Sequence, residues 1–188
     1  MKRLLALLLA LPLLGAAPDT LDYAVDRAQS SVAAKVAFLG LASKTASFPS
    51  MSGTVRIAPE RPQDMAINIT IDATRLTAPD AVTLGRLRGE KFFWVEKYPA
   101  IKFAGRSMTI LGPKRGKVDG SLTARGVTRP VALDVVFDRP VSALTDGRPV
   151  TITANTRIDR RDFGMTSYSL IVGRKVDIAI KARMNPGK

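Results

Sequence analysis

The sequence predicts an all-β fold, a barrel or a sandwich of about eight antiparallel strands. Apolar and polar residues alternate with a period of two in eight segments, as in strands that have one face on an interior and one face in water. Turn residues, mainly Gly, Pro and one Asp-Gly pair, separate these segments. A single stretch, residues 79–98, departs clearly from the alternation. No long linker divides the chain, so one domain is expected.

Each predicted strand carries an apolar face and a polar face. In chain order the strands are expected at residues 31–38, 54–57, 66–72, 101–103, 118–123, 131–138, 152–159 and 176–183. The inward positions include several small residues, which are Ala34, Gly105, Gly120, Ala124, Ala154 and Ala182. Small inward residues in a barrel of about eight strands favour an unfilled interior that takes an apolar ligand. The alternative is that larger neighbours fill this space.

The departure from the alternation predicts a helical insertion around residues 80–95. Pro79-Asp80 is typical of a helix start, and the Phe92-Phe93-Trp94 cluster follows among apolar residues at roughly helical spacing. Gly85 and Gly89 weaken a long helix, so one or two short helices are expected. Such an insertion either caps one end of a barrel or plugs its core.

The first residues have the order of a secretory signal peptide. A basic start, Met1-Lys2-Arg3, precedes an apolar run from Leu4 to Leu14 and the small residues Gly15-Ala16-Ala17. The run is too short to cross a bilayer core, which needs about 20 residues. We therefore expect an approximate signal peptide at residues 1–17, one domain at residues 18–188, and a periplasmic or secreted mature protein.

Composition excludes several kinds of chemistry. The chain has no Cys and no His, which excludes disulfides, thiolate nucleophiles, zinc sites built on these residues and Ser-His-Asp triads. The net charge is +13, of which Lys2 and Arg3 in the predicted signal peptide contribute two. This charge favours anionic partners, and export argues against nucleic acid among them. No catalytic residue, metal or cofactor is expected.

Five motifs, in order from Tyr23 to the last predicted strand, resemble the YceI-like family of polyisoprenoid-binding proteins. They are Tyr23-Ala24-Val25-Asp26 with Gln29-Ser30-Ser31-Val32; Phe48-x-x-Met51-x-Gly53; Leu87 with Phe92-Phe93 and Tyr98-Pro99-x-Ile101-x-Phe103; Gly120-x-Leu122-Thr123-x-x-Gly126-Val127-Thr128-x-Pro130-Val131; and Arg160-x-Asp162-Phe163-Gly164-Met165 ahead of Val172-Gly173. The resemblance implies a single lipocalin-like antiparallel barrel that holds an isoprenoid or another long-chain lipid, as a carrier or as a stress-related store.

The resemblance and the strand alternation together indicate the ligand-binding residues. The expected pocket residues are Phe38, Phe92, Phe93, Trp94, Phe103, Leu133, Phe137 and Ile178, with Arg86 and Tyr168 as head-group contacts. The family often has His at the positions of Gln29 and Phe38, so this chain departs from it at polar positions. The cations Arg86, Arg88 and Lys91 suit an anionic head such as a phosphate. Alternatively, they solvate a helix face.

Two other functions are compatible with the sequence. The first is a basic module that binds anionic polymers or lipid head groups on its outer surface. Its residues would be Lys114, Arg115, Lys117, Arg160, Arg161, Arg174 and Lys175. The second is an enzyme that uses a buried Asp or Tyr. The expected partners remain a long-chain lipid and an anionic membrane surface, for a monomer or homodimer.

Overall fold

The computed structural model describes residues 20–40, 42–58, 60–61 and 64–187, so the predicted signal peptide lies outside the described residues. Within them the chain forms ten strands and one α-helix, α1 (Ala81–Arg88). The strands are β1 (Leu21–Val25), β2 (Ser31–Phe38), β3 (Ala42–Phe48), β4 (Met51–Ile57), β5 (Ala66–Asp72), β6 (Ala100–Gly112), β7 (Arg115–Ala124), β8 (Val127–Phe137), β9 (Val150–Asp159) and β10 (Val172–Pro186). The helix is too short to span a membrane, and no other described helix is long and apolar enough to do so.

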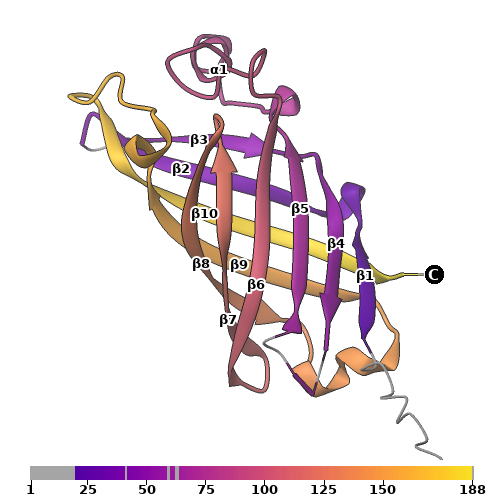
Figure 1. Cartoon of the computed structure of the whole chain (residues 1–188). Coiled ribbons are helices and arrows are strands. Elements are labelled where there is room, and N and C mark those ends of the chain that lie inside the picture. The colour runs from indigo at the N-terminus through magenta and orange to yellow at the C-terminus, as the bar shows by residue number, and fades with distance from the viewer. Residues whose placement is uncertain (1–19, 41, 59, 62–63, 188) are drawn as a thin grey trace, which may run out of the picture.

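The strands form one antiparallel sheet that closes on itself. Its order is β1-β4-β5-β6-β7-β8-β9-β10, and β1 pairs with β10 to complete an eight-stranded barrel. Two extra strands, β2 and β3, continue the sheet from the first part of β10 (Figure 1). The prediction of an all-β, lipocalin-like barrel with one helical insertion is therefore confirmed.

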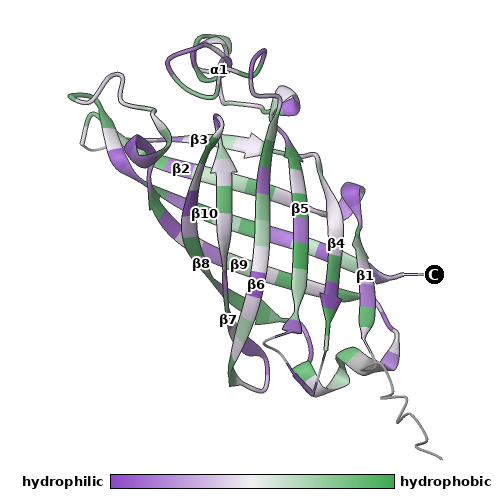
Figure 2. Ribbon diagram, in the orientation of Figure 1, coloured by the Kyte–Doolittle hydropathy of each residue, from purple (hydrophilic) through white to green (hydrophobic). Residues whose placement is uncertain are grey.

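The alternation correctly identified which residues face inward, but not every strand. Figure 2 shows apolar and polar bands alternating along the strands. Two strands, β1 and β3, were not predicted, because β1 is short and β3 (ASKTASF) consists mostly of small and polar residues. The predicted strand 101–103 is the beginning of the much longer β6, in which Gly105 and Arg106 interrupt the pattern.

The two ends of the barrel differ. We call the end that carries α1, the β2–β3 turn and the β9–β10 connection the open end (Figure 1). At the opposite, closed end the short 3-10 helix Val141–Asp146 lies between β8 and β9, and its Leu144 is fully buried. The hydroxyl of buried Tyr23 donates a hydrogen bond of 2.5 Å to the Leu144 carbonyl. A solid core of large side chains therefore fills the closed end.

Two of the small inward residues do not leave empty space. A Cβ on Gly120 would lie 2.6 Å from the Phe103 ring, and a Cβ on Gly105 would lie 2.9 Å from the Ile67 side chain. These glycines accommodate large neighbours from adjacent strands, as the alternative reading of the sequence proposed. Only some of the small positions, among them Ala34 and Ala124, contribute to an open interior.

The helical insertion begins where Pro79-Asp80 predicted. The Asp80 carboxylate accepts a hydrogen bond of 2.7 Å from the Thr83 amide, which caps the N-terminus of α1. Gly89 follows the last helical residue, and turns continue to Lys97. A second bond from Asp80, an ion pair of 2.9 Å with Lys44, ties the start of α1 to strand β3. The insertion therefore lies against the open end of the barrel.

Candidate functional site

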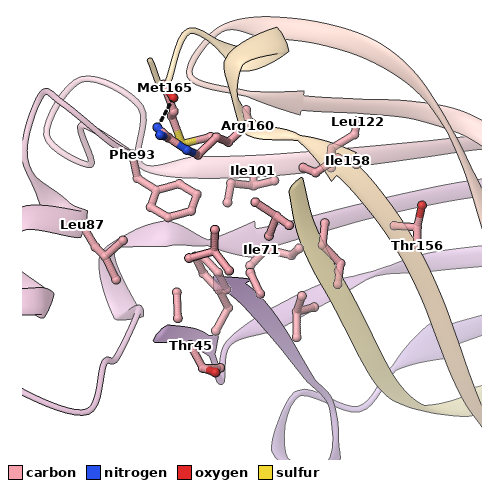
Figure 3. A pocket seen from close by; sticks show the side chains of 18 of the residues that line it. Thr45, Ile71, Leu87, Phe93, Ile101, Leu122, Thr156, Ile158, Arg160 and Met165 are labelled. Carbon is pink, nitrogen blue, oxygen red and sulfur yellow. Dashed lines mark hydrogen bonds between the residues drawn. The ribbon is translucent and has the colours of Figure 1, made fainter. Parts of the chain in front are cut away.

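An apolar cavity of about 170 Å³ lies inside the barrel toward its open end. Its wall comes from β2 to β10, from the segment that follows β9 and from the helical insertion (Figure 3). Most of the wall is aliphatic, and among its members are Val32, Val36, Ile69, Ile71, Ile101, Leu122, Val131, Ile158, Val176 and Ile180. An enclosed apolar wall of this kind favours an apolar ligand, because little of the surface offers hydrogen bonds.

The cavity has a floor. Phe103 lines it and also belongs to the core that fills the closed end of the barrel. The Phe103 ring lies over Gly120, so no further side chain separates this ring from the β7 backbone. Below it the interior is packed with buried side chains such as Met108 and Val135. Phe103 therefore marks the inner end of the cavity, which lies between this ring and the open end of the barrel.

One row of residues across three strands contributes to the space in the cavity. Ala34 of β2 lies opposite Ile178 of β10 on one side and Ala46 of β3 on the other, and all three line the cavity. Two alanines in one cross-strand row leave a volume that larger residues would occupy. This row is the clearest example of the predicted relation between small inward residues and an open interior.

Aromatic and aliphatic residues of the insertion cover the mouth of the cavity. Phe93 packs edge-on against Phe48 of the barrel, with ring centroids 5.3 Å apart, and Leu87 of α1 lines the cavity beside it (Figure 3). Phe92 also lines the cavity and is buried. These contacts place the insertion as a cover over the barrel, which is one of the two arrangements that the sequence allowed.

A buried arginine lies in the wall near the mouth. Arg160 is only 3% exposed, and its guanidinium donates to three main-chain carbonyls: Gly173 at 2.9 Å, Val172 at 3.0 Å, and Met165. Its charge also lies 6.0 Å from the centre of the Phe92 ring. Burial lowers the pKa of Arg160, since a cation loses its hydration there. The result is one buried cation in a wall that is mostly apolar.

Sequence reasoning assigned Arg160 to the outer surface, and the structure corrects this. The inward residues of β9 are Ile152, Ala154, Thr156 and Ile158, so the same period of two, continued by one step, points Arg160 inward. The signal was therefore present in the sequence. It was overridden by the general expectation that an arginine faces water.

The carboxylate of Asp159, next to Arg160, is buried among three cations. Arg174 lies at 2.8 Å, Arg161 at 3.4 Å and Lys175 at 3.8 Å from its oxygens. Burial raises the pKa of Asp159, but hydrogen bonds from the backbone and side chain of Arg161 and from Arg174 outweigh this and bring the pKa to about 2. The ionised carboxylate thus holds the ends of β9 and β10 together.

Replacing Asp159 with Asn is expected to destabilise the fold at neutral pH. The pKa of about 2 lies below the ordinary value of 3.8, so the ionised form stabilises the folded state above about pH 4. This contribution is lost as the pH falls toward 2. Urea unfolding of both proteins at neutral and acid pH measures it, with exposed Asp119→Asn as the control. A difference that stays the same at acid pH would contradict the assignment.

Five of the eight predicted pocket residues line the cavity. They are Phe92, Phe93, Phe103, Leu133 and Ile178. Their contact with a ligand remains a prediction. The cavity also has wall residues that sequence reasoning did not name, such as Phe48, Leu87 and Met165. Phe48, Leu87 and Met165 belong to the family motifs, which is the signal that could have identified them.

Three predicted residues lie outside the cavity wall. Phe137 is four residues beyond Leu133 on β8, about 13 Å farther along the strand, and packs in the closed-end core. Phe38 is the last residue of β2, where its ring meets the Lys44 ammonium at 5.6 Å. Trp94 has a left-handed backbone (φ 47°), and its ring packs against Tyr98 and under Lys97. The strand alternation predicts whether a side chain points into the barrel, but it does not predict how far along the barrel axis that side chain lies.

The two predicted head-group residues lie together one layer outside the cavity. The Tyr168 ring stacks on Phe92 with centroids 5.8 Å apart, and Arg86 and Lys91 approach the Tyr168 ring to 5.7 and 5.4 Å. Phe92 therefore separates this pair from the interior. Their contact with a head group stays a prediction, and it requires a ligand whose polar end extends beyond Phe92.

The basic residues proposed for binding an anionic polymer do not form one face. Lys114, Arg115 and Lys117 belong to the β6–β7 hairpin at the closed end, where Pro113-Lys114 forms the tight turn (Figure 1). The others lie at the open end, where Arg160 is buried and Arg161, Arg174 and Lys175 surround Asp159. Among the described residues, no group of three or more metal-ligating side chains is close enough to hold a metal ion.

Curated proteins of similar sequence span nearly the whole chain. A UPF0312 protein of Shewanella putrefaciens is 28% identical over 167 residues, which cover 87% of each chain. A UPF0312 protein of Vibrio parahaemolyticus is 30% identical over 173 residues, covering 87% of this chain and 89% of the relative.

Solved structures share the fold. BcnA of Burkholderia cenocepacia superposes with a TM-score of 0.75 at 22% identity, over 85% of this chain and 98% of that one. A structure described as a polyisoprenoid-binding domain of Saccharophagus degradans implicated in plant cell wall breakdown gives a TM-score of 0.65 at 14% identity, over 88% and 98% of the chains. The family model of the YceI-like domain matches residues 23–184. With this match over nearly the whole barrel, and with the family's motifs distributed along it, the chain belongs to the YceI-like family.

Proposed function

We propose that this protein is a lipid-binding protein that holds an isoprenoid or another long apolar chain inside its barrel. The observation that supports this most directly is the apolar cavity of about 170 Å³, which is open at one end and closed by Phe103 at the other. The polyisoprenoid-binding description of one structural neighbour is consistent with such a ligand. Holding a chain in this way needs no catalytic group, so a binding protein is favoured over an enzyme.

The order of basic, apolar and small residues at the N-terminus supports export as part of the same proposal. A carrier or store of lipid outside the cytoplasm would keep a long apolar chain out of water. Each buried CH₂ contributes about 0.8 kcal/mol, so one five-carbon isoprene unit contributes at most about 4 kcal/mol. Even two buried units would therefore offset a large part of the entropy lost on binding.

The depth of the cavity limits how much chain it holds. A dry cavity of about 150 Å³ accommodates a molecule of the size of benzene. The cavity here, at about 170 Å³, accordingly encloses a short length of chain. A longer ligand extends through the open end or displaces side chains of the wall. Where the ligand extends through the open end, its polar end or the remaining chain would lie near Arg160 and the cavity mouth.

The affinity for prenyl alcohols is expected to rise with chain length and then level off. We would titrate the lipid-free protein with geraniol, farnesol and geranylgeraniol by calorimetry, with a polyether of similar length as the control. Burial of apolar surface predicts a negative heat-capacity change for the prenols. Organic extraction and native mass spectrometry of freshly purified protein would identify the natural ligand. Absence of both a co-purified lipid and prenol uptake would refute the proposal.

A further inference from the structure

We propose that the open end of the barrel docks on an anionic lipid bilayer, with the cavity mouth facing the membrane. The inference rests on the proposed lipid ligand and adds the surface through which that ligand is exchanged. The observation that supports it is the presence of three large apolar side chains exposed to water at the open end. The cavity itself does not explain their exposure.

These side chains are Leu39 in the β2–β3 turn, Val82 in α1 and Leu170 in the β9–β10 connection. They are 62%, 64% and 98% exposed. Scattered exposed apolar residues are ordinary on a protein surface. These three, however, come from three separate segments that meet at one end of the barrel (Figure 1). We call them the apolar rim.

A hydrogen bond and an ion pair connect the segments of the apolar rim to their neighbours. The Leu39 amide donates to the Ile171 carbonyl at 2.8 Å, which joins the β2–β3 turn to the connection that carries Leu170. The 2.9 Å ion pair between Lys44 and Asp80 joins β3 to the helix that carries Val82. The three segments that carry these side chains are therefore linked to one another through the β2–β3 hairpin.

Local conformation does not require an apolar residue at these positions. Leu39 has a left-handed backbone with φ of 52°, where Gly or Asn is favoured, and its side chain is exposed rather than packed. Leu170 lies in a connection without regular strand or helix structure and is almost fully in water. Because both side chains are largely exposed, they contribute little to the stability of the free protein. A membrane interface would bury both.

Cations surround the apolar rim. The described segments of the open end, residues 38–40, 42–45, 78–98, 124–127 and 159–176, contain ten Lys and Arg, of which only Arg160 is buried, against five Asp and Glu. Arg86 and Lys91 lie over the Tyr168 ring and have no ion-pair partner among the described residues. Exposed apolar side chains within a basic surface match an anionic bilayer, where head groups attract the cations and the interface accepts the apolar groups.

Docking in this orientation would let a lipid move between bilayer and cavity without crossing water. Exposing an apolar chain to water costs about as much free energy as burying it contributes. Direct transfer avoids this exposure and therefore lowers the barrier to loading and release. The aromatic residues at the mouth, Phe92 and Phe93, would then lie between the cavity and the membrane.

Vesicle flotation with matched variants tests the proposal. The wild-type chain is expected to bind vesicles of two parts phosphatidylcholine to one part phosphatidylglycerol, and to bind pure phosphatidylcholine much more weakly. The triple variant Leu39→Ser, Val82→Ser, Leu170→Ser is expected to reduce the bound fraction at least tenfold. The matched control replaces three exposed apolar residues away from the open end, Ile110→Ser, Leu111→Ser and Val136→Ser, and should retain binding.

Charge reversal gives a second, independent measurement. Lys91→Glu is expected to weaken binding to the anionic vesicles roughly tenfold or more, since each cation near such a surface contributes about fivefold. Lys117→Glu in β7 is the control and should have a much smaller effect. Added salt should weaken wild-type binding, because the interaction is screened beyond about 10 Å at 0.1 M salt.

The outcomes distinguish this inference from the proposed function. Prenol titration of the triple serine variant should match the wild type, because none of the three residues lines the cavity. If prenols bind but the rim and control variants bind vesicles equally, the docking inference is wrong and the lipid-binding proposal stands. If wild-type protein self-associates without lipid and the serine variant does not, the rim joins two copies of the chain, and the inference is also overturned.

Discussion

Replacing Ala34 with Phe is expected to reduce prenol affinity about 100-fold or more. Ala34 lies in the middle of the row that opens the cavity, between Ile178 and Ala46. A phenyl ring has about the size of the benzene molecule that fills a 150 Å³ cavity, so it would take up most of the 170 Å³. Excluding one buried isoprene unit is already sufficient for a loss of this size.

The matched control is Ala179→Phe. Ala179 follows Ile178 on β10, is exposed, and faces away from the interior. This substitution adds the same side chain to a neighbouring strand without filling the cavity. Calorimetric titration of both variants gives the result, and thermal unfolding of each establishes that it is folded. If Ala34→Phe retained wild-type affinity, the prenyl chain would bind elsewhere, and the cavity would not be the lipid site.

The second large effect is expected for Arg160→Met, as a loss of stability. Methionine fills much of the arginine's volume but leaves the carbonyls of Met165, Val172 and Gly173 without a donor. Leaving a buried acceptor without its donor typically costs 1–3 kcal/mol, and for the three carbonyls together we expect a loss of about 4 kcal/mol. For a chain of this length that corresponds to a fall of about 10 °C in the midpoint of thermal unfolding.

Arg157→Met, two residues earlier on β9, provides the control. Arg157 is exposed and forms an ion pair of 2.5 Å with exposed Asp177, an arrangement that contributes less than about 1 kcal/mol. Urea unfolding of both variants compares a buried and an exposed arginine of the same strand. A stability loss of less than about 1 kcal/mol for Arg160→Met would show that the three carbonyls do not depend on the guanidinium.

Arg160 also illustrates why a site residue can be misread from sequence. The expectation that cations face water is correct for most arginines of this chain, and it was applied to the run Arg160-Arg161. Only the second of these is exposed. The decisive evidence is the set of carbonyls around the guanidinium, which belong to residues 165, 172 and 173 and come together through the β9–β10 connection. Sequence spacing alone does not reveal that convergence.

Prediction was strongest where a local pattern decides the outcome. The inward faces of β5, β8 and β9 follow directly from the period of two, since successive side chains of a strand point to opposite faces. The start of α1 follows from the capping chemistry of Asp80. By contrast, β3 was missed because its small and polar residues carry no alternation, and it is recognised only by its pairing with β2.

The sequence by itself thus determined the barrel class, the inward residues, the place of the helical insertion and the family motifs. The tertiary structure decided which part of the inward surface is a cavity. Leu133 and Phe137 face the interior alike, yet one lines the cavity and the other is packed in the solid core. Likewise, Ala34 leaves space whereas Gly120 receives the Phe103 ring. The physical reason is that empty volume depends on the side chains facing a residue across strands, and strand register sets those neighbours.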